Sequence, residues 1–264
     1  MISLLVRANA KINLNFQIVN KLPSGLHQIK SDFQSIDLAD FLLFEKASKN
    51  QFTGAIVCPE AQNIILKAQK RLARAVKKNL SCRIHLHKTI PIAAGLGGGS
   101  ADAAATLFAL NKIYHLDLSL RQLAEIGIKI GADVPFFFHG GTCRVEGVGE
   151  KIKPIQEKLP RFFVLFRPHK RLQTSQMYER YDQTKKSFFA LAKELCPEIK
   201  ILEKRLKKFS VKNLSLSGSG PTVFCAANDY DLAKKISESY PQFDGDIFIC
   251  RPQAKGLEIV GSQE

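Results

Sequence analysis

The sequence predicts an α+β fold that is divided into two lobes. Strand-like and helix-like segments follow one another along the 264 residues without the strict alternation that builds a doubly wound parallel sheet. A chain of this length has room for one large domain or for two lobes of ordinary size. The connection from Pro154 to Pro160 lies between two strand-like segments and is the best boundary. It divides the chain into lobes over residues 1–155 and 156–264.

The first lobe begins with the clearest alternation in the chain. Over residues 4–19 polar and apolar side chains alternate, which places Lys11, Asn13 and Asn15 on one face of a strand. The other expected elements, in order, are a turn at Pro23–Gly25, a strand over Phe33–Phe44, a helix over 61–79, a strand over 81–90, a helix over about 100–113, a helix over about 119–130 and a strand over 142–148.

The second lobe is expected to mix four strands with four helices. In order, these are a strand over 162–167, helices near 174–181, 186–194 and 198–208, strands over 213–217 and 221–227, a helix over 230–239 and a strand over 245–251. A glycine-rich turn joins the strands over 213–217 and 221–227.

The chain is strongly basic, with 39 Lys and Arg against 24 Asp and Glu and a formal net charge of +15. Such a charge favours anionic partners, such as nucleic acid, a membrane surface or phosphorylated metabolites. The excess is spread over both lobes without a basic tail, which excludes a tethered polyanion-binding arm. The helix over 61–79 has a basic face, which is most often the solvated side of a helix. A nucleic-acid-binding module is therefore kept only as an alternative of a different class.

Cysteine spacing and hydropathy predict a cytoplasmic protein. The six cysteines lie 24 or more residues apart without a C-x-x-C pair, which favours reduced thiols over a zinc knuckle or a disulfide scaffold. The apolar run Ile2–Val6 stops at Arg7 and is too short for a signal peptide. The stretch Pro91–Leu110 holds a single charge, Asp102, but its loop-like start and its glycine and alanine content argue against a membrane span.

The strongest functional feature is a glycine-rich loop between a strand and a helix. It reads Ile92-Ala93-Ala94-Gly95-Leu96-Gly97-Gly98-Gly99-Ser100-Ala101-Asp102. Consecutive glycines let backbone N–H groups turn inward, and the following helix points the positive end of its dipole into the loop. The loop therefore predicts a phosphate site. It is not a P-loop, because Ser100 rather than Lys follows the last glycine, and it fits the dinucleotide fingerprint poorly.

Three further features could supply chemistry. Lys11 and Asn13 place an ammonium and an amide on one strand face, where both can reach one ligand. Asp133 is a single carboxylate among apolar residues just past a helix end. The turn Gly218–Gly220 permits close approach of the backbone to a ligand. Taken alone, each feature also fits a structural role, as a polar strand face, a turn cap or a tight turn.

These four features, in this order, resemble the GHMP kinases, a family of small-molecule kinases. The resemblance covers nearly the whole chain and rests on the segments Ala10-Lys11-Ile12-Asn13-Leu14, Gly25-Leu26-His27, Phe33-Gln34-Ser35-Ile36-Asp37-Leu38, Gly95-Leu96-Gly97-Gly98-Gly99-Ser100 and Gly131-Ala132-Asp133-Val134-Pro135-Phe136. It implies a two-lobed fold with the active site in the cleft, and transfer of the γ-phosphoryl group of ATP to a hydroxyl. The combination is most similar to the member whose acceptor is a cytidine diphosphate-linked polyol. A mevalonate, homoserine or sugar acceptor is the alternative.

The resemblance also implies roles for individual residues. Asp133 would be the base that takes the hydroxyl proton, and Lys11 would pair with it and stabilise charge at the reacting oxygens. Asn13 and His27 would hold the acceptor, His27 through the edge of the cytosine. The ATP phosphates would be surrounded by Pro91, Ile92, Ala93, Ala94, Gly95, Leu96, Gly97, Gly98, Gly99, Ser100 and Ala101.

Two positions depart from the family pattern. The residue before the family's histidine is usually aromatic and stacks on the cytosine, but here it is Leu26. Tyr178 is a candidate to replace that ring, and Gly218 and Ser219 are expected to contact the acceptor. The glycine loop opens with Ala93-Ala94 where the family often has glycines.

Magnesium is expected to arrive with ATP and to be held largely by the ATP phosphates. The sequence shows no dedicated carboxylate cluster, so no metal ligand is assigned. His85 and His87 lie two apart on a strand, but without a third ligand they are better interpreted as a polar strand face.

Overall fold

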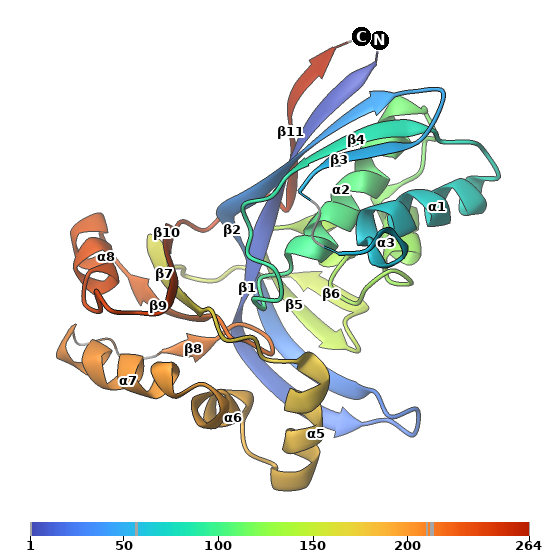
Figure 1. Ribbon diagram of the computed structural model, residues 1–264. Helices are drawn as coiled ribbons and strands as arrows, with labels where there is room; N and C mark the ends of the chain where they lie inside the picture. Colours follow the sequence, from blue (N-terminus) through green and yellow to red (C-terminus); the bar gives the residue numbers. More distant parts are fainter. Residues whose placement is uncertain (1, 56–57, 210, 212–213, 264) are drawn as a thin grey trace.

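A long antiparallel hairpin organises the fold. The computed structural model describes residues 2–55, 58–209, 211 and 214–263. Strands β1 (Ser3–Lys21) and β2 (His27–Lys46) pair over nearly their whole lengths (Figure 1). The turn between them is closed by the Leu22 N–H, which donates to the Leu26 carbonyl over 2.8 Å. Gly25 takes a φ of +85° there, which agrees with the turn expected from the sequence.

Because β2 is long, it pairs with different strands along its two halves. Its C-terminal half pairs with β4 (Cys82–His87) and its N-terminal half with β5 (Thr142–Gly147). The sheet is completed by β3 (Gln51–Gly54) on β4, β6 (Lys151–Pro154) on β5 and β11 (Leu257–Gln263) on β1, which makes seven strands among the described residues.

Helix α2 (Gly98–Ile113) packs across β1 and β2, with α1 (Ile64–Val76) and α3 (Leu120–Gly127) beside it (Figure 1). The alanines of α2 are almost all fully buried, and their small side chains let the helix approach the sheet closely. The basic side chains of α1 are exposed, as expected for a solvated face. A 3₁₀ turn at Glu60–Gln62 and the short helix α4 (Phe136–His139) complete this part of the chain.

A second, antiparallel sheet has four strands among the described residues. Its order is β10-β7-β9-β8, from β7 (Phe162–Pro168), β8 (Ser215–Leu216), β9 (Val223–Ala227) and β10 (Gly245–Cys250). Its helices are α5 (Thr174–Thr184), α6 (Phe188–Leu195), α7 (Pro197–Leu206) and α8 (Tyr230–Ser237), with a 3₁₀ turn at Lys207–Phe209. The strand expected over 213–217 is shorter, and its first residue lies outside the described residues.

The two sheets, each with its own helices, confirm the α+β class. The structure adds one detail to the division into lobes. The sequence places all of 156–264 in the second lobe, whereas β11 runs beside β1 in the first sheet, next to the N-terminus (Figure 1). Pairing with β11 covers an edge of β1 that would otherwise expose unpaired backbone groups. A boundary near residue 155 remains our proposal, with β11 assigned to the first lobe.

The glycine loop is anchored where the two sheets meet. Ala94 and Leu96 are buried in an apolar cluster that also contains Ile12 from the first sheet and Phe163 and Phe224 from the second. The Leu96 carbonyl accepts the Lys11 backbone N–H over 2.9 Å. The side chains of Ala94 and Leu96 are therefore fixed in the core, whereas Gly95 and Gly97, which alternate with them, are only partly buried.

All six cysteines are free thiols, in agreement with the expectation from their spacing. Burial raises the pKa of Cys225 to about 12, which removes its thiolate at neutral pH. Over the described part of the chain, no helix has the length and apolar character needed to cross a membrane.

Candidate active site

A cavity of about 440 Å³ lies where β1, the glycine loop and the second lobe meet. The residues predicted from the sequence supply much of its lining, from segments far apart in the chain. They are Lys11, Asn13, His27, Ala93, Gly95, Gly97, Ser100, Asp133, Tyr178, Gly218 and Ser219. The sequence therefore identified residues that the fold brings together, and their roles stay proposals.

Lys11 is the buried cation of this cavity. It is 3% exposed, and its Nζ lies 2.8 Å from Asn13 Oδ1, 3.2 Å from Asp133 Oδ2 and 4.3 Å from the centre of the Phe33 ring. An ammonium has three N–H donors, of which Asn13 and Asp133 take two. The third is left for a ligand in the cavity, where an anionic oxygen is the best acceptor.

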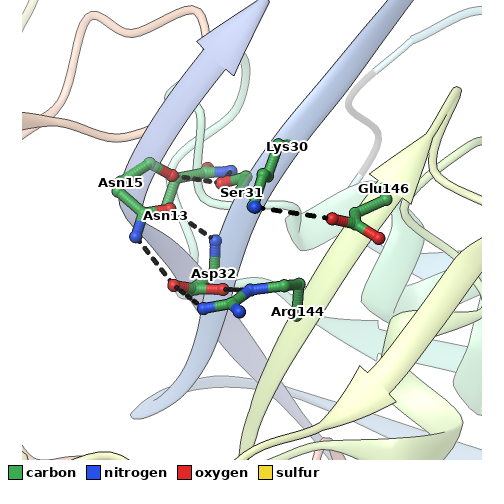
Figure 2. Close-up of polar contacts among 7 residues, drawn as sticks. All are labelled: Asn13, Asn15, Lys30, Ser31, Asp32, Arg144 and Glu146. Atoms are coloured by element: carbon green, nitrogen blue, oxygen red, sulfur yellow. Dashed lines mark hydrogen bonds and ion pairs between the residues drawn. The ribbon is translucent and has the colours of Figure 1, made fainter. Parts of the chain in front are cut away.

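A chain of polar contacts behind Asn13 fixes the orientation of its amide (Figure 2). Asn13 Nδ2 donates to Ser31 Oγ over 3.0 Å, and Ser31 Oγ donates to the Asn15 carbonyl. Since the amide nitrogen is engaged there, the amide oxygen faces Lys11. Between β5 and β2, Arg144 Nε lies 2.9 Å from Asp32 Oδ1. Asn15 Nδ2 donates to Asp32 Oδ2 over 2.7 Å.

The strand alternation expected for β1 does not run unbroken through this network. Asn15 was expected on the same face as Lys11 and Asn13, but Phe16 lines the cavity in its place. The register of β1 on β2 shifts between Asn13 and Asn15, and an irregularity of this kind moves the following side chains to the opposite face. Asn15 instead binds Asp32. Burial raises the pKa of Asp32, but the hydrogen bonds from Arg144 and Asn15 lower it, and the pKa is lowered overall.

The glycine loop adopts the left-handed backbone that its sequence favours. Gly95 and Gly97 have φ values of +77° and +72°, and Ala93 has a φ of +53° despite its side chain. Helix α2 follows at once, with Gly97 as an N-cap that has no side chain to satisfy the first N–H groups. These free N–H groups and the helix dipole make the loop an anion site.

A second cavity, of about 320 Å³, lies along the same loop. It is lined by the loop from Pro91 through Ser100, by the start of α1 and by Lys88 and Asp102. The two cavities share Ala93, Gly95, Gly97 and Ser100, so they adjoin along the loop. Of the predicted loop residues, Ala101 lines neither cavity because its side chain is buried in the core.

We expect Gly95→Ala to destabilise the protein by about 2 kcal/mol or more. The alanine would hold a left-handed backbone, which costs about 1–2 kcal/mol, and its Cβ would overlap the Ser217 carbonyl oxygen. Ser217 would have to move, although its Oγ now donates to the Gly95 carbonyl over 2.8 Å. Chemical denaturation measures the change, with Gly99→Ala as the matched control.

Gly99 has a helical backbone, and the nearest atom to a Cβ there is Ile64 Cγ2 at 3.6 Å. The control should therefore change the free energy of unfolding by less than about 1 kcal/mol, because alanine is the better helix former. Equal destabilisation by the two alanines would contradict this account of the loop.

The far end of the first cavity is an aromatic cluster around His27. The Tyr178 ring stacks on the His27 imidazole at a centroid distance of 4.6 Å, and Phe188 packs against Tyr178 at 5.0 Å. Burial, together with the charge of Asp133, raises the pKa of Tyr178 to about 12. Leu26 is 57% exposed and lies in the hairpin turn, so the ring next to His27 comes from the second lobe.

Sequence reasoning missed a buried charge cluster under the glycine loop. Lys88 Nζ contacts the carboxylate of Asp40 and lies 3.3 Å from Asp102 Oδ2. Asp40 Oδ1 also accepts the backbone N–H groups of Thr89 and Ile90, over 2.6 and 2.8 Å. A signal was present, because Asp102 is the one charge within Pro91–Leu110 and Asp40 lies in an apolar strand.

One cation in this cluster faces two buried carboxyl groups, so ionisation of both would leave a net negative charge in the core. Asp40 has the shorter contact with Lys88 and two backbone N–H donors, so its contacts stabilise a negative charge better than those of Asp102 do. Burial, reinforced by the nearby charge of Asp40, raises the pKa of Asp102 well above its ordinary value, although Lys88 opposes the shift. We assign the proton of the cluster to Asp102.

This assignment predicts a pH dependence that Asp102→Asn should remove. A group whose pKa is raised by folding stabilises the folded state fully below its unfolded pKa, and loses that contribution as the pH rises through its folded pKa. The asparagine does not titrate. The free energy of unfolding of the variant, relative to the wild type, should therefore increase from about pH 5 to about pH 8. Urea denaturation at several pH values tests this, and a difference independent of pH would exclude a protonated Asp102.

A glycine loop at a helix N-terminus, two cavities that adjoin along it and a buried lysine paired with an aspartate indicate a phosphoryl-transfer enzyme. The family models agree with this class. Residues 63–141 match the GHMP kinase N-terminal domain and residues 172–245 match the GHMP kinase C-terminal domain. The chain belongs to the GHMP kinases, and kinases of this family take their phosphoryl group from ATP.

Relatives and solved structures narrow the comparison. A 4-diphosphocytidyl-2-C-methyl-D-erythritol kinase from Carboxydothermus hydrogenoformans is 36% identical, over 96% of this chain and 98% of its own. A crystal structure of 4-(cytidine 5'-diphospho)-2C-methyl-D-erythritol kinase superposes with a TM-score of 0.77 at 27% identity, over 95% of this chain and 98% of that one. A homoserine kinase from Cytophaga hutchinsonii has a TM-score of 0.76 at 16% identity, covers 98% of this chain and 97% of its own, and shares the fold.

Proposed function

We propose that this protein transfers the γ-phosphoryl group of ATP to the 2-hydroxyl of 4-diphosphocytidyl-2-C-methyl-D-erythritol. The observation that carries the proposal is the Lys11–Asp133 pair, at 3.2 Å, in the first of two cavities that adjoin along a glycine loop. The relatives that match nearly the whole chain carry the name of this activity.

The two cavities suit a donor and an acceptor. ATP would occupy the second cavity, with its phosphates at the N-terminus of α2 and its γ-phosphate at the loop residues that both cavities share. The acceptor would occupy the first cavity, with its reacting hydroxyl at Asp133 and its cytosine at His27 and Tyr178. Gly218 and Ser219 would close the cavity from the second lobe, where Ser219 Oγ lies 2.8 Å from Thr174 Oγ1.

The residues around the hydroxyl supply the proton transfer and the charge. Asp133 would accept the hydroxyl proton as the acceptor oxygen bonds to the γ-phosphorus and the bond to the bridging β,γ-oxygen breaks, releasing ADP. Lys11 would hold the Asp133 carboxylate in place and direct its third N–H toward the oxygens of the transferred group. The helix dipole of α2 and the loop N–H groups would offset the remaining negative charge.

Magnesium is proposed to enter with ATP. Among the described residues no group of three or more His, Cys, Asp or Glu side chains is placed to hold a metal ion. Ser100 and Asp133 are two of the side chains with oxygen atoms that line the first cavity, and Mg²⁺ is usually bound by one or two protein oxygens together with phosphates and water. When bound, the ion neutralises charge on the phosphates.

An acceptor screen with ATP tests the proposal. Turnover is measured with 4-diphosphocytidyl-2-C-methyl-D-erythritol, mevalonate, homoserine and a set of sugars, as ADP release and as phosphorylated product. We expect product only with the cytidine diphosphate-linked acceptor, because only that acceptor fills the His27 end of the cavity. Phosphorylation of another acceptor in its place would overturn the proposal and leave the kinase class intact.

We propose that this basic chain is a cytoplasmic small-molecule enzyme rather than a nucleic-acid-binding module. The exposed lysines and arginines of α1 are expected to form a solvated face. Polynucleotide binding would fall steeply with salt, so titration of labelled RNA and DNA at low salt separates the two functions. Tight, salt-sensitive binding would favour the alternative.

A further inference from the structure

The imidazole of His27 is held by a residue that the sequence analysis did not identify. His27 Nε2 lies 2.8 Å from Asp182 Oδ1, and Lys21 Nζ lies 2.5 Å from Asp182 Oδ2. Lys21 and His27 are cross-strand partners beside the β1–β2 turn, and Asp182 comes from α5 in the second lobe. Asp182 therefore binds both strands of the hairpin at the edge of the cavity.

Asp182 is ionised, which makes it an acceptor at both oxygens. Hydrogen bonds from Lys21 and then from His27 lower the pKa of Asp182 to about 2. Lys185 adds a further positive charge, with its Nζ 3.8 Å from Oδ1. A carboxylate without a proton cannot donate, so the hydrogen between it and His27 belongs to Nε2.

When the imidazole is neutral, this contact decides the hydrogen-bonding character of the other ring nitrogen. In a neutral imidazole that carries its hydrogen on Nε2, Nδ1 has a lone pair and can only accept. The ring cannot turn easily, because Tyr178 stacks on its face at an interplanar angle of 23° and Tyr181 packs against it edge-on at 6.2 Å. His27 lines the first cavity, and Nδ1 is the ring nitrogen that does not contact Asp182.

An acceptor at this position distinguishes one pyrimidine from another. Cytosine carries an exocyclic amino group, which donates, where uracil carries a carbonyl oxygen, which only accepts. Opposite a fixed acceptor, the amino group makes a hydrogen bond, whereas a carbonyl leaves two lone pairs facing each other. A site built to bond a donor rejects the analogue that lacks it, because its own polar atom is then left unpaired.

We infer that Asp182, supported by Lys21, is a specificity-determining residue that holds His27 as a hydrogen-bond acceptor and so makes the site select an amino-bearing pyrimidine over an oxo-bearing one. This inference rests on the proposed function for the placement of the base at His27. Asp182 is a positioning residue, since it acts through His27 and does not touch the base.

The test compares CDP with UDP as ligands of the first cavity. Dissociation constants are measured by calorimetry with the ATP site saturated by a non-hydrolysable ATP analogue, for the wild type, Asp182→Asn and Asp182→Ala. The asparagine is informative because its amide can donate to Nε2, which moves the ring hydrogen to Nδ1 and turns the acceptor into a donor. Glu179→Gln is the matched control, because it removes one negative charge from an exposed position on the same helix.

We expect the wild type and Glu179→Gln to bind CDP about tenfold or more tightly than UDP, and Asp182→Asn to lose this preference or reverse it. Equal weakening of both ligands in the Asp182 variants would assign Asp182 a structural role only and overturn the inference. An unchanged CDP-to-UDP ratio in Asp182→Asn would overturn it as well.

Two further readouts separate this inference from the proposed function. The nitrogen-15 spectrum of the His27 ring, assigned with His27→Gln, should show the hydrogen on Nε2 in the wild type and a changed signal in Asp182→Asn. With the cytidine-linked acceptor, Asp182→Ala should raise KM at least tenfold and leave kcat within about threefold, since Asp133 and Lys11 are unaltered. A wild type that prefers CDP but does not phosphorylate this acceptor would refute the proposed function alone.

Discussion

Asp133→Asn is expected to lower kcat for phosphoryl transfer by about 10²–10⁴-fold, which is the usual contribution of a positioned general base. The asparagine has the size of the aspartate, but its amide cannot take the hydroxyl proton. ATP affinity should change little, because Asp133 lines the first cavity and the ATP phosphates are proposed to lie at the N-terminus of α2. Single-turnover kinetics at saturating acceptor measures the chemical step directly.

The fold should survive this change, since the Asp133 side chain is 32% exposed. Asp117→Asn, at an exposed position before α3, is the control, and its turnover should equal that of the wild type. Turnover of Asp133→Asn within tenfold of the wild type would exclude Asp133 as the base. A loss that disappears at high ATP would move its role from proton transfer to donor binding.

Lys11 and Asp133 should act as one unit. Lys11→Met removes the cation that contacts Asp133 and would contact the transferred group, so it too is expected to reduce kcat strongly. If the pair works together, the double variant should be little less active than the less active of the two single variants. Losses that multiply would show that the two side chains contribute independently.

The parts of this site that a local pattern encodes could be predicted from the sequence. The alternation along β1 puts Lys11 and Asn13 on one face, and both side chains reach the cavity. The run of glycines before an alanine-rich helix predicts a loop at a helix N-terminus, and the backbone of Gly95 and Gly97 agrees. Each of these signals depends only on residues that are neighbours in the chain.

What depends on packing between distant segments was missed. Asp182 lies 155 positions from His27, and nothing in the sequence around it says that α5 docks against the hairpin turn. No glycine indicates the register shift after Asn13 in the sequence. Phe16 therefore lines the cavity at the place expected for Asn15. β11 pairs with β1 along an edge of the sheet that would otherwise be free. A strand pattern alone does not reveal which edge of a sheet is free.

The buried cluster under the glycine loop lies between these two cases. An isolated charge in an apolar segment signals a buried partner, but not its identity. Lys88 Nζ would be 2.8 Å from a Cβ at Gly98, the first residue of α2, where the helix dipole disfavours a cation. The Asp40 carboxylate offsets that cost, and the contacts of Lys88 with Asp40 and Asp102 connect β2, the strand end before the loop and α2.

Asp40→Ala is therefore expected to be the most destabilising single change outside the apolar core, by about 3–5 kcal/mol. Asp40 is fully buried, and its removal leaves the N–H groups of Thr89 and Ile90 without their acceptor and Lys88 without its closest counter-charge. Unsatisfied buried groups cost about 1–3 kcal/mol each, although water entering the gap recovers part of this. Guanidinium denaturation gives the change in the free energy of unfolding.

Two variants keep this prediction decisive. Asp40→Asn retains an oxygen for the two N–H groups but not the charge, so it should fall between Asp40→Ala and the wild type and serves if the alanine variant does not fold. Glu125→Ala breaks an exposed ion pair with Arg121 on α3, where the expected loss is below about 1 kcal/mol. Since Thr89 and Ile90 lead directly into the glycine loop, Asp40→Asn should also weaken ATP binding, which Glu125→Ala should not. Destabilisation by Asp40→Ala no larger than that by Glu125→Ala would show that the cluster does not hold the loop.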